Sequence, residues 1–315
     1  MLRQKAKAES LKPRIIFLVG PTAIGKSALA IGLARKINAE IISCDSMQIY
    51  KGLDILSSKP DKKMCGEVKH HLLDVASPEK EFNVALYRRL ALQAIKNIHR
   101  RKKIPLFVGG SGLYMSVVID GIFKEAGADL KIRRRLYEEA ENKGINFLYE
   151  RLRGIDAQAA RKIHPNDLKR IVRALEVYQK TGKTISELKK TRKGLSDKYD
   201  ILIFGLNKDR EKLYQDINSR VEEMFEQGLV TEVKKLMPLK LSLTCRQAIG
   251  INEIKGYLEG KYGLEEAKEL IKRNTRRYAK RQLTWFRKDK RIIWIGAQEG
   301  KRTVKKIIEK ICRGF

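Results

Sequence analysis

The chain has 315 residues, of which 43% are hydrophobic, so it is long enough to bury a large core in one domain or two. Lysine and arginine total 68 against 37 acidic residues, and the formal net charge of +31 favours a partner rich in phosphates, such as a nucleic acid. The four cysteines are scattered without a CxxC pair and no apolar run is long enough to span a bilayer, which argues against a disulfide framework, a zinc site and a membrane protein and predicts a cytoplasmic location.

Residues 1–12 are basic and contain no hydrophobic signal core, so we expect them to form a flexible arm, with a mitochondrial presequence as the alternative. The first predicted strand, Ile15–Val19, leads into a loop that carries two glycines and ends in Lys26-Ser27, and an apolar helix follows. This order of strand, loop and helix is typical of a phosphate-binding P-loop. Its amides and helix N-terminus point at the anion, Lys26 adds positive charge, and the Ser27 hydroxyl is placed to bind Mg²⁺. The predicted phosphate site consists of Gly20, Pro21, Thr22, Ala23, Ile24, Gly25, Lys26 and Ser27.

A second strand is predicted over Ala39–Ser43, and Asp45 follows just past its end. Open α/β sheets place ligand chemistry at the carboxyl ends of their strands. A carboxylate beside a P-loop could serve as a base or a metal partner, and it could equally cap a following helix. Spacing alone leaves both interpretations open.

Residues 53–60 are predicted to form a loop by their serine and proline content, and His70–Val75 to form a short strand. Adjacent residues of a strand point to opposite faces, so His70 and His71 cannot readily share a metal ion. We interpret both histidines as structural or as supports for residues that contact a ligand.

Asn83 is a good N-cap for a helix that ends at a basic cluster near Arg100. The strand Ile104–Val108 follows and closes in the glycine-rich turn Gly109–Tyr114. This turn brings Ser111 to the same edge of the sheet as the P-loop. The glycines are compatible with a close approach to a ligand and with a plain tight turn.

From Phe123 to Leu195 the pattern changes, because predicted helices dominate and basic residues are dense. Arg170 and Arg173 lie one helical turn apart and so face one side. A helical insertion that presents arginines suits a nucleic-acid backbone, although an exposed subdomain without a partner would have the same pattern.

The sheet is predicted to resume at Tyr199–Gly205, followed by a long helix that ends at Gly228 and carries Arg220 on its polar side. A later helix has a very basic end and runs into Gln282–Arg287, and its basic residues are interleaved with Tyr278, Trp285 and Phe286. Such residues could grip a backbone and stack on bases, or Trp285 could belong to the core. A last strand is predicted over Arg291–Ile295.

The expected fold class is therefore α/β, a P-loop NTPase-like parallel sheet flanked by helices, with an inserted all-helical subdomain. The expected core comprises residues 13–122 and 196–315, and the insertion residues 123–195. Nothing in the sequence suggests an obligate partner subunit, so a monomer is expected.

Taken in order, the motifs resemble the tRNA dimethylallyltransferase family, and the resemblance covers nearly the whole chain. The stretches that carry it are Gly20–Ser27, Asp45–Gln48, Lys59-Pro60, His70–Asp74, Gly109–Tyr114, Asn166–Glu176, Arg246–Gly250 and Lys280–Arg287. The chain departs from the family at Leu56-Ser57-Ser58, where Gly-Thr-Ala is usual, and at Ser111 and Ile251, where Thr and Tyr are usual. It also lacks the C-terminal zinc finger of many eukaryotic relatives.

The resemblance implies that the P-loop binds the diphosphate of dimethylallyl diphosphate with Mg²⁺ as cofactor. The implied acceptor is N6 of the adenosine immediately 3′ of the anticodon in the tRNA anticodon stem-loop, flipped out of its stack. Asp45 is implied as the base that accepts the N6 proton, and Thr22, Lys26, Ser27 with Mg²⁺, and Arg220 as the groups that stabilise the leaving diphosphate. The tRNA contacts implied in the same way are Asp45, Ser46, Met47, Gln48, Ser111, Arg133, Lys169, Arg170, Ile171, Val172, Arg173, Arg246, Gln247, Ala248, Ile249, Gly250, Ile251, Lys280, Arg281, Gln282, Leu283, Thr284, Trp285, Phe286 and Arg287.

Three other functions would each require features that differ from those of this sequence. A P-loop kinase or ATPase would need a second acidic metal ligand after an apolar strand, whereas Ile104–Val108 ends in glycines. An adenylate isopentenyltransferase would not need the arginine-bearing insertion or the basic C-terminal helix. A non-catalytic RNA-binding protein would not need an intact P-loop beside Asp45.

Overall fold

The computed structural model describes residues 12–123, 127–297 and 300–313. The chain forms two compact units, one of residues 1–118 and 196–315 and one of residues 119–195. The second unit begins a few residues before the predicted start of the insertion at 123. The predicted flexible arm, residues 1–12, lies outside the described residues except for Lys12. None of the helices that the described residues form has the length and hydrophobicity of a membrane span.

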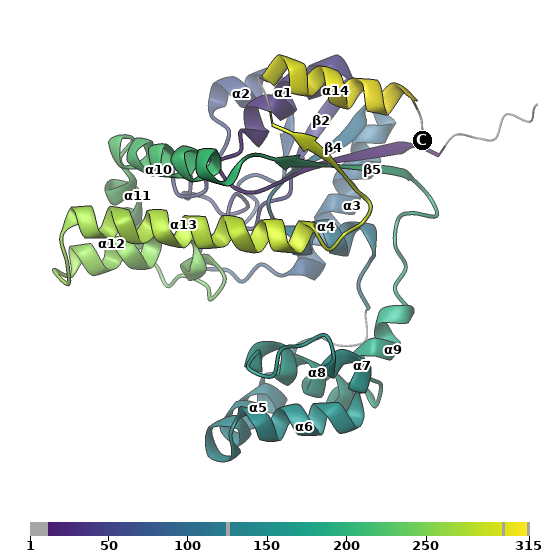
Figure 1. Ribbon diagram of the computed structural model, residues 1–315, viewed down its shortest axis with the longest axis vertical. Coiled ribbons are helices and arrows are strands. Elements are labelled where there is room, and N and C mark those ends of the chain that lie inside the picture. Colours follow the sequence, from purple (N-terminus) through teal and green to yellow (C-terminus); the bar gives the residue numbers. More distant parts are fainter. Residues whose placement is uncertain (1–11, 124–126, 298–299, 314–315) are drawn as a thin grey trace, which may run out of the picture. The chain divides into compact units, whose positions relative to one another are not determined.

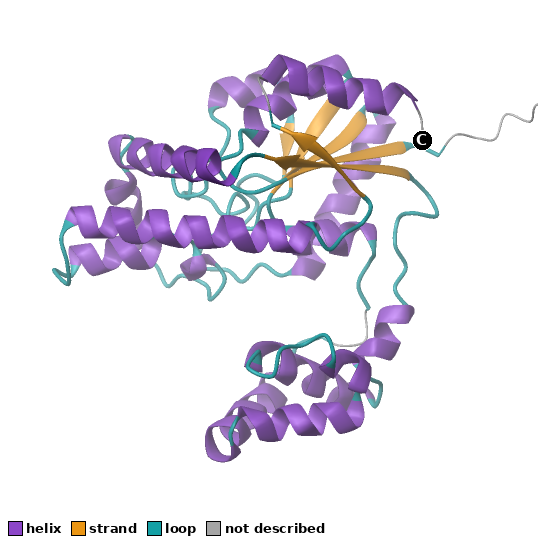
Figure 2. Ribbon diagram, in the orientation of Figure 1, coloured by secondary structure: helices purple, strands orange, loops and turns teal. Residues whose placement is uncertain are grey.

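A sheet of six parallel strands forms the centre of the larger unit, with the order β3-β2-β4-β1-β5-β6 (Figures 1 and 2). Its two central strands are buried on both faces, which explains why they read as continuous apolar runs. The α/β prediction is confirmed. The strands are β1 Arg14–Val19, β2 Ala39–Ser43, β3 His70–His71, β4 Ile104–Gly109, β5 Asp200–Asn207 and β6 Ile292–Gly296.

Helices cover both faces of this sheet (Figure 2). Alternate residues of β1 serve the two faces: Ile16 and Leu18 join a core cluster with Leu33 and Ile307 of the helices α1 and α14, whereas Phe17 stacks on Phe107. The helices around the sheet are α1 Lys26–Lys36, α2 Lys62–Glu67, α3 Val84–Arg100, α4 Gly112–Ile119 and α14 Gly300–Arg313.

A further layer of helices follows β5, and Figure 1 shows these helices side by side. Val221, Leu229, Ile254 and Ile271 form its own small core. The layer consists of α10 Arg210–Glu226, α11 Leu229–Leu236, the 3₁₀ turn Cys245–Gln247, α12 Ile251–Leu258 and α13 Leu264–Phe286. Arg220, Glu232 and Gln282 of this layer bond loops at the carboxyl edge of the sheet.

The smaller unit is helical throughout its described residues, as expected of the insertion. Leu136, Leu148, Leu152 and Leu175 centre its core, which is separate from that of the sheet. Its helices are α5 Leu130–Lys143, α6 Ile145–Ile155, α7 Ala157–Ala160, α8 Leu168–Thr181 and α9 Ile185–Lys190.

Two local predictions were wrong in detail. The strand expected over His70–Val75 is only two residues long, because Leu72 and Asp74 have φ of 63° and 53° and so cannot continue a strand. Gly228 does not end α10 as a C-cap. Its φ of 97° lets it connect α10 to α11 as the N-cap of the latter, and Gln227 closes α10.

A buried carboxylate ties the edge of the sheet together near the amino ends of the strands. Glu40 of β2 is 1% exposed and bonds His71 Nε2 of β3 at 2.7 Å. Arg101 donates to both oxygens of Glu40, at 3.0 and 2.7 Å, and Lys103 lies 3.4 Å away. Burial alone would raise the pKa of Glu40, but the bonds from Arg101 and His71 outweigh it and lower that pKa to about 2. His71 is therefore structural, as predicted.

We predict that Glu40→Gln lowers the free energy of unfolding at pH 7 by about 1–3 kcal/mol, because a buried charge-assisted network loses its acceptor. Since the folded-state pKa of Glu40 is depressed, its contribution is present above the unfolded-state value and is lost as the pH falls towards 2. Urea unfolding at pH 7 and pH 3 measures both effects. Glu67→Gln, which loses only an exposed pair with Arg35 at 3.3 Å, is the control and should stay within about 0.5 kcal/mol of the parent. An equal loss in both variants would contradict the assignment.

Candidate active site

Three loops meet at one edge of the sheet because β1, β2 and β4 end level with one another. Val19 of β1 pairs with Gly109 of β4, and Ser43 of β2 pairs with Val108 of β4. The predicted P-loop, the segment that carries Asp45 and the glycine-rich turn follow directly. The carboxyl edge of the sheet therefore collects the residues that sequence reasoning had placed there.

The P-loop leaves the N-terminus of α1 open to a ligand. Ala23 and Gly25 have φ of 63° and 85°, and the chain turns sharply into the helix between them. No side chain of the described residues caps α1, so its first N–H groups are available to an anion. Lys26 Nζ donates to Pro21 O at 2.6 Å and is thereby held over the loop.

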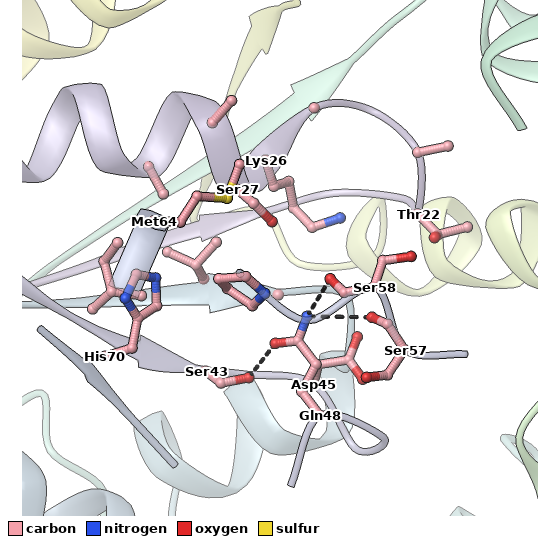
Figure 3. A pocket seen from close by; sticks show the side chains of 18 of the residues that line it. Thr22, Lys26, Ser27, Ser43, Asp45, Gln48, Ser57, Ser58, Met64 and His70 are labelled. Carbon is pink, nitrogen blue, oxygen red and sulfur yellow. Dashed lines mark hydrogen bonds between the residues drawn. The ribbon is translucent and has the colours of Figure 1, made fainter. Parts of the chain in front are cut away.

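A cavity of about 280 Å³ opens in front of this loop (Figure 3). Thr22, Lys26, Asp45 and Arg220, the four predicted catalytic residues, all line it, and so does the predicted metal ligand Ser27. Arg220 comes from α10 and donates to Thr22 Oγ1 at 3.0 Å, so it points into the cavity and not to solvent as its position on the polar side of the helix had suggested. Residues 198 positions apart are thus joined directly.

Two cationic side chains share this small space. Loss of water on burial lowers the pKa of Lys26 to about 7, and the charge of Arg220 acts in the same direction while Asp45 opposes it. Burial also lowers the pKa of Arg220, again against Asp45. Neither side chain forms an ion pair within the described part of the chain, so the cavity is prepared for an anion.

Asp45 is held by the loop that follows β2. Met47 N donates to Asp45 Oδ1 at 2.8 Å, and Ser46 N donates to Ser111 Oγ at 3.0 Å. Asp45 does not cap a helix, because no helix begins at this loop in the described structure. Gly109 explains the close approach of the turn, since a Cβ there would lie 2.1 Å from Cys44 O.

Gln282 of α13 fixes the P-loop against the glycine-rich turn. Thr22 N donates to Gln282 Oε1 at 2.9 Å, and Gln282 Nε2 donates to Gly110 O at 3.0 Å. Gln282 is buried, and a Cβ on Gly110 would lie 2.0 Å from its Nε2. The residue that resemblance assigned to tRNA therefore positions the P-loop. Its sequence signal was one polar residue on the apolar stripe of an otherwise basic helix.

The loop 53–58 forms the facing wall and is held by a carboxylate that the sequence analysis missed. Glu232 of α11 accepts from the backbone N–H groups of Asp54, Ile55 and Leu56 at 2.8–2.9 Å. Gln48 Nε2 donates to the carbonyls of residues 57 and 58, and Ser43 Oγ donates to Gln48 Oε1 at 2.8 Å (Figure 3). Gln48 thus links this wall to the strand that ends beside Asp45. No local pattern marks Glu232, because its partners lie more than 170 positions away.

The predicted contacts in the smaller unit fall into two groups. Lys169 and Arg170 are exposed on α8, whereas Ile171 and Val172 are buried in the core of the unit and their side chains cannot reach a partner. Arg133 and Arg173 both bond the buried Glu176, at 3.0 and 2.7 Å. Burial would raise the pKa of Glu176, and the N–H of residue 129 with these two arginines lowers it. Helical periodicity would have separated the two groups.

The predicted contacts of the larger unit divide in the same way. Arg246, Gln247, Lys280, Arg281, Thr284, Trp285 and Arg287 are exposed, whereas Ala248, Gly250, Ile251, Gln282 and Phe286 are buried and Ile249 and Leu283 are half-buried. Trp285 is 39% exposed, and its ring lies against Gly112, where a Cβ would come within 2.2 Å of it. Trp285 is therefore only partly buried, and one part of its ring is exposed to solvent.

Comparison with known proteins finds one family and relatives that share one name. The family described as "IPP transferase" matches residues 48–289. Two curated proteins named tRNA dimethylallyltransferase are similar: that of Halothermothrix orenii is 47% identical over 96% of this chain and 93% of its own, and that of Carboxydothermus hydrogenoformans 50% identical over 96% and 97%.

Solved structures give the same result. The full-length tRNA isopentenylpyrophosphate transferase of Bacillus halodurans has a TM-score of 0.71 at 38% identity, over 96% of both chains. A eukaryotic dimethylallyltransferase, described as acting on tRNA, has a TM-score of 0.80 at 31% identity, over 96% of this chain and 79% of its own.

We predict that Gln282→Ala weakens the binding of inorganic pyrophosphate about tenfold, because Thr22 N–H and Gly110 C=O lose their partner and the P-loop is no longer held. Isothermal titration calorimetry measures the dissociation constant. Thr284→Ala is the matched control, since Thr284 lies on the same helix, is exposed and, among the described residues, bonds only Lys280 O. Unchanged pyrophosphate binding in a folded Gln282→Ala protein would rule out the positioning role.

Anion binding should also depend on pH through Lys26. Its pKa of about 7 means that Lys26 is charged below that pH and neutral above it, and only the charged form attracts an anion. The dissociation constant for sulfate, which does not titrate in this range, should rise about tenfold from pH 6 to pH 8. Lys26→Met should remove the dependence and Lys36→Met, at the exposed end of α1, should retain it. A flat profile for the parent protein would show that Lys26 keeps its charge throughout.

Proposed function

The chain belongs to the IPP transferase family, and from this membership we propose that it transfers a dimethylallyl group from dimethylallyl diphosphate to N6 of the adenosine immediately 3′ of the anticodon in tRNA, releasing diphosphate. The single observation that carries the proposal is the convergence of Thr22, Lys26, Asp45 and Arg220 on one cavity in front of a P-loop. The names of the relatives supply the reaction class.

The donor diphosphate fits the cationic side of the cavity. The open N-terminus of α1, Lys26 and Arg220 provide N–H donors and positive charge on one side of the space. As the C1–O bond of the donor breaks, negative charge grows on the diphosphate, and these groups are already in place to stabilise it. Because Arg220 is bonded to Thr22, the loop and the guanidinium act on the same leaving group.

Asp45 fits the role of the proton acceptor. The N6 lone pair of adenine is delocalised into the ring, so N6 is a weak nucleophile. As N6 attacks C1 of the donor, the new N–C bond forms, the C1–O bond breaks, and the N6 proton passes to the Asp45 carboxylate. The second carboxylate oxygen is not used by Met47 N–H and is free to accept it.

Mg²⁺ is proposed as the cofactor, and the donor set of the cavity suits it. Ser27 offers one hydroxyl beside the P-loop, and no cluster of three His, Cys, Asp or Glu side chains lies within the described ranges. Mg²⁺ usually keeps waters and binds substrate phosphates with few protein ligands. When bound to Ser27 and the donor diphosphate, it would neutralise charge on the leaving group.

The tRNA is assigned to the exposed basic residues. Lys280 and Arg281 on α13, Arg287 just past its end, and Lys169 and Arg170 on α8 are solvent-facing cations in a chain of net charge +31. Their contacts with phosphates would position the tRNA and offset the cost of unstacking the target base, a few kcal/mol. We propose a cytoplasmic monomer.

The proposal is tested by the transfer of labelled dimethylallyl diphosphate, with Mg²⁺, to unmodified tRNA that carries adenosine 3′ of the anticodon. Asp45→Asn should reduce transfer by at least about 10²-fold, because the proton acceptor is lost while the bond from Met47 N–H can be kept. The affinity for tRNA, measured by filter binding, should change little. Asp197→Asn, which changes an exposed carboxylate outside the cavity lining, should transfer at the parent rate.

Adenosine monophosphate as acceptor and ATP turnover serve as parallel assays. Label in tRNA alone supports the proposal, whereas label in the free nucleotide would identify an adenylate isopentenyltransferase. Brisk ATP hydrolysis without transfer would show that the P-loop holds a different phosphate compound. If tRNA binding collapsed together with transfer in Asp45→Asn, Asp45 would be structural.

A further inference from the structure

The cavity changes character from one end to the other. Thr22 and its partner Arg220 give one side of the cavity a polar and cationic lining, whereas Met64 and His70 lie on the opposite side, with Lys26 between them (Figure 3). The lining also includes the apolar side chains of Ala30, Ile41 and Val108, which belong to the core cluster that Met64 packs against. An apolar recess next to a diphosphate site has the chemistry to hold a hydrocarbon chain that is attached to that diphosphate.

Met64 closes this recess from α2. Its backbone is fixed, since Met64 N donates to Asp61 Oδ1 at 2.7 Å and Met64 O accepts from Val68 N. Its side chain packs against the main core cluster, which includes Ala30, Ile41 and Val68. Met64 also lines a larger open groove that runs past Asp61, Lys62 and Cys65, so its side chain stands between the recess and that groove. Shortening this side chain would join the two spaces and lengthen the recess.

His70 completes the closure from β3. Its Nδ1 donates to Val68 O at 2.7 Å, which fixes the plane of the ring. Burial lowers the pKa of His70, and the ring is therefore neutral near pH 7, as suits an apolar wall. The short strand that carries it is held to β2 by the pairing of His70 with Ile41 and by the bond from His71 to Glu40.

We propose that Met64 and His70 form the end wall of the alkyl recess and restrict the donor to one isoprene unit, so that allylic diphosphates of two isoprene units are excluded. The inference rests on the proposed function, because it assigns the recess to the hydrocarbon part of the same donor. The wall acts only on the chain beyond the first isoprene unit. The P-loop, Arg220 and Asp45 would treat both donors alike.

The test compares dimethylallyl diphosphate with geranyl diphosphate as donors to unmodified tRNA. The parent protein should use geranyl diphosphate poorly. Met64→Ala, and more strongly Met64→Ala with His70→Ala, should raise the ratio of kcat/KM for geranyl to that for dimethylallyl diphosphate by about tenfold or more, because space for the second unit is opened. Lys63→Ala, an exposed neighbour on α2, is the matched control and should leave the ratio unchanged.

A larger side chain at Met64 tests the end wall independently if the shortened variants unfold. Met64→Trp should raise KM for dimethylallyl diphosphate about tenfold, while inorganic pyrophosphate inhibits as in the parent protein, because the P-loop is untouched. Parent protein that modifies tRNA, together with an unchanged donor ratio in folded Met64→Ala and double variants, would overturn the end wall alone. Parent protein that transfers neither donor would overturn the proposed function itself. If Met64→Trp weakened pyrophosphate and donor equally, Met64 would act on the P-loop and the end wall would be wrong.

Discussion

The rest of the site depends on the confinement of two positive charges in one small cavity. Lys26 and Arg220 both enter a space of about 280 Å³, and each disfavours the charge of the other. Folding alone offers them no ion pair in the described residues. Asp45 is the largest of the groups that favour their charged forms, and Glu223 adds to it for Arg220. Such an arrangement is poorly stable by itself, and an anion that enters the cavity relieves it.

Elements that lie far along the chain maintain this arrangement. Arg220 comes from α10, Glu232 from α11 and Gln282 from α13, and each bonds a loop of the N-terminal half. All three follow the helical insertion in the chain. The P-loop, Asp45 and the glycine-rich turn therefore form a complete site only when the last third of the chain has packed against the sheet, which ties the catalytic geometry to the folding of the whole larger unit.

Local patterns predicted most of the fold, and non-local contacts account for what was missed. The strands at Ile15, Ala39 and Ile104 and the N-cap at Asn83 are short-range signals, and the structure has them where expected. The strand at His70 was overestimated because positive φ values after His71 leave no mark in an apolar pattern. The roles of Gln282 and Glu232 depend on partners 170–260 positions away, which no periodicity encodes. The burial of Ile171 and Val172, in contrast, was readable from their place on the apolar face of α8.

Buried charges have partners at the amino end of the sheet and lack them at the carboxyl end. At the amino end, Glu40 is surrounded by Arg101, His71 and Lys103, so its charge is satisfied within the chain and contributes to stability. At the carboxyl end, Lys26 and Arg220 are left without such partners, and their charge is available to a ligand. β2 joins the two ends, since Glu40 lies near its start and Asp45 just past its finish, with His70 beside it at the apolar end of the cavity. The Glu40 network fixes β2 at its amino end, and it therefore also helps to fix the proposed base and the recess at the carboxyl end. The stability that this network contributes offsets the cost of leaving Lys26 and Arg220 without ion-pair partners.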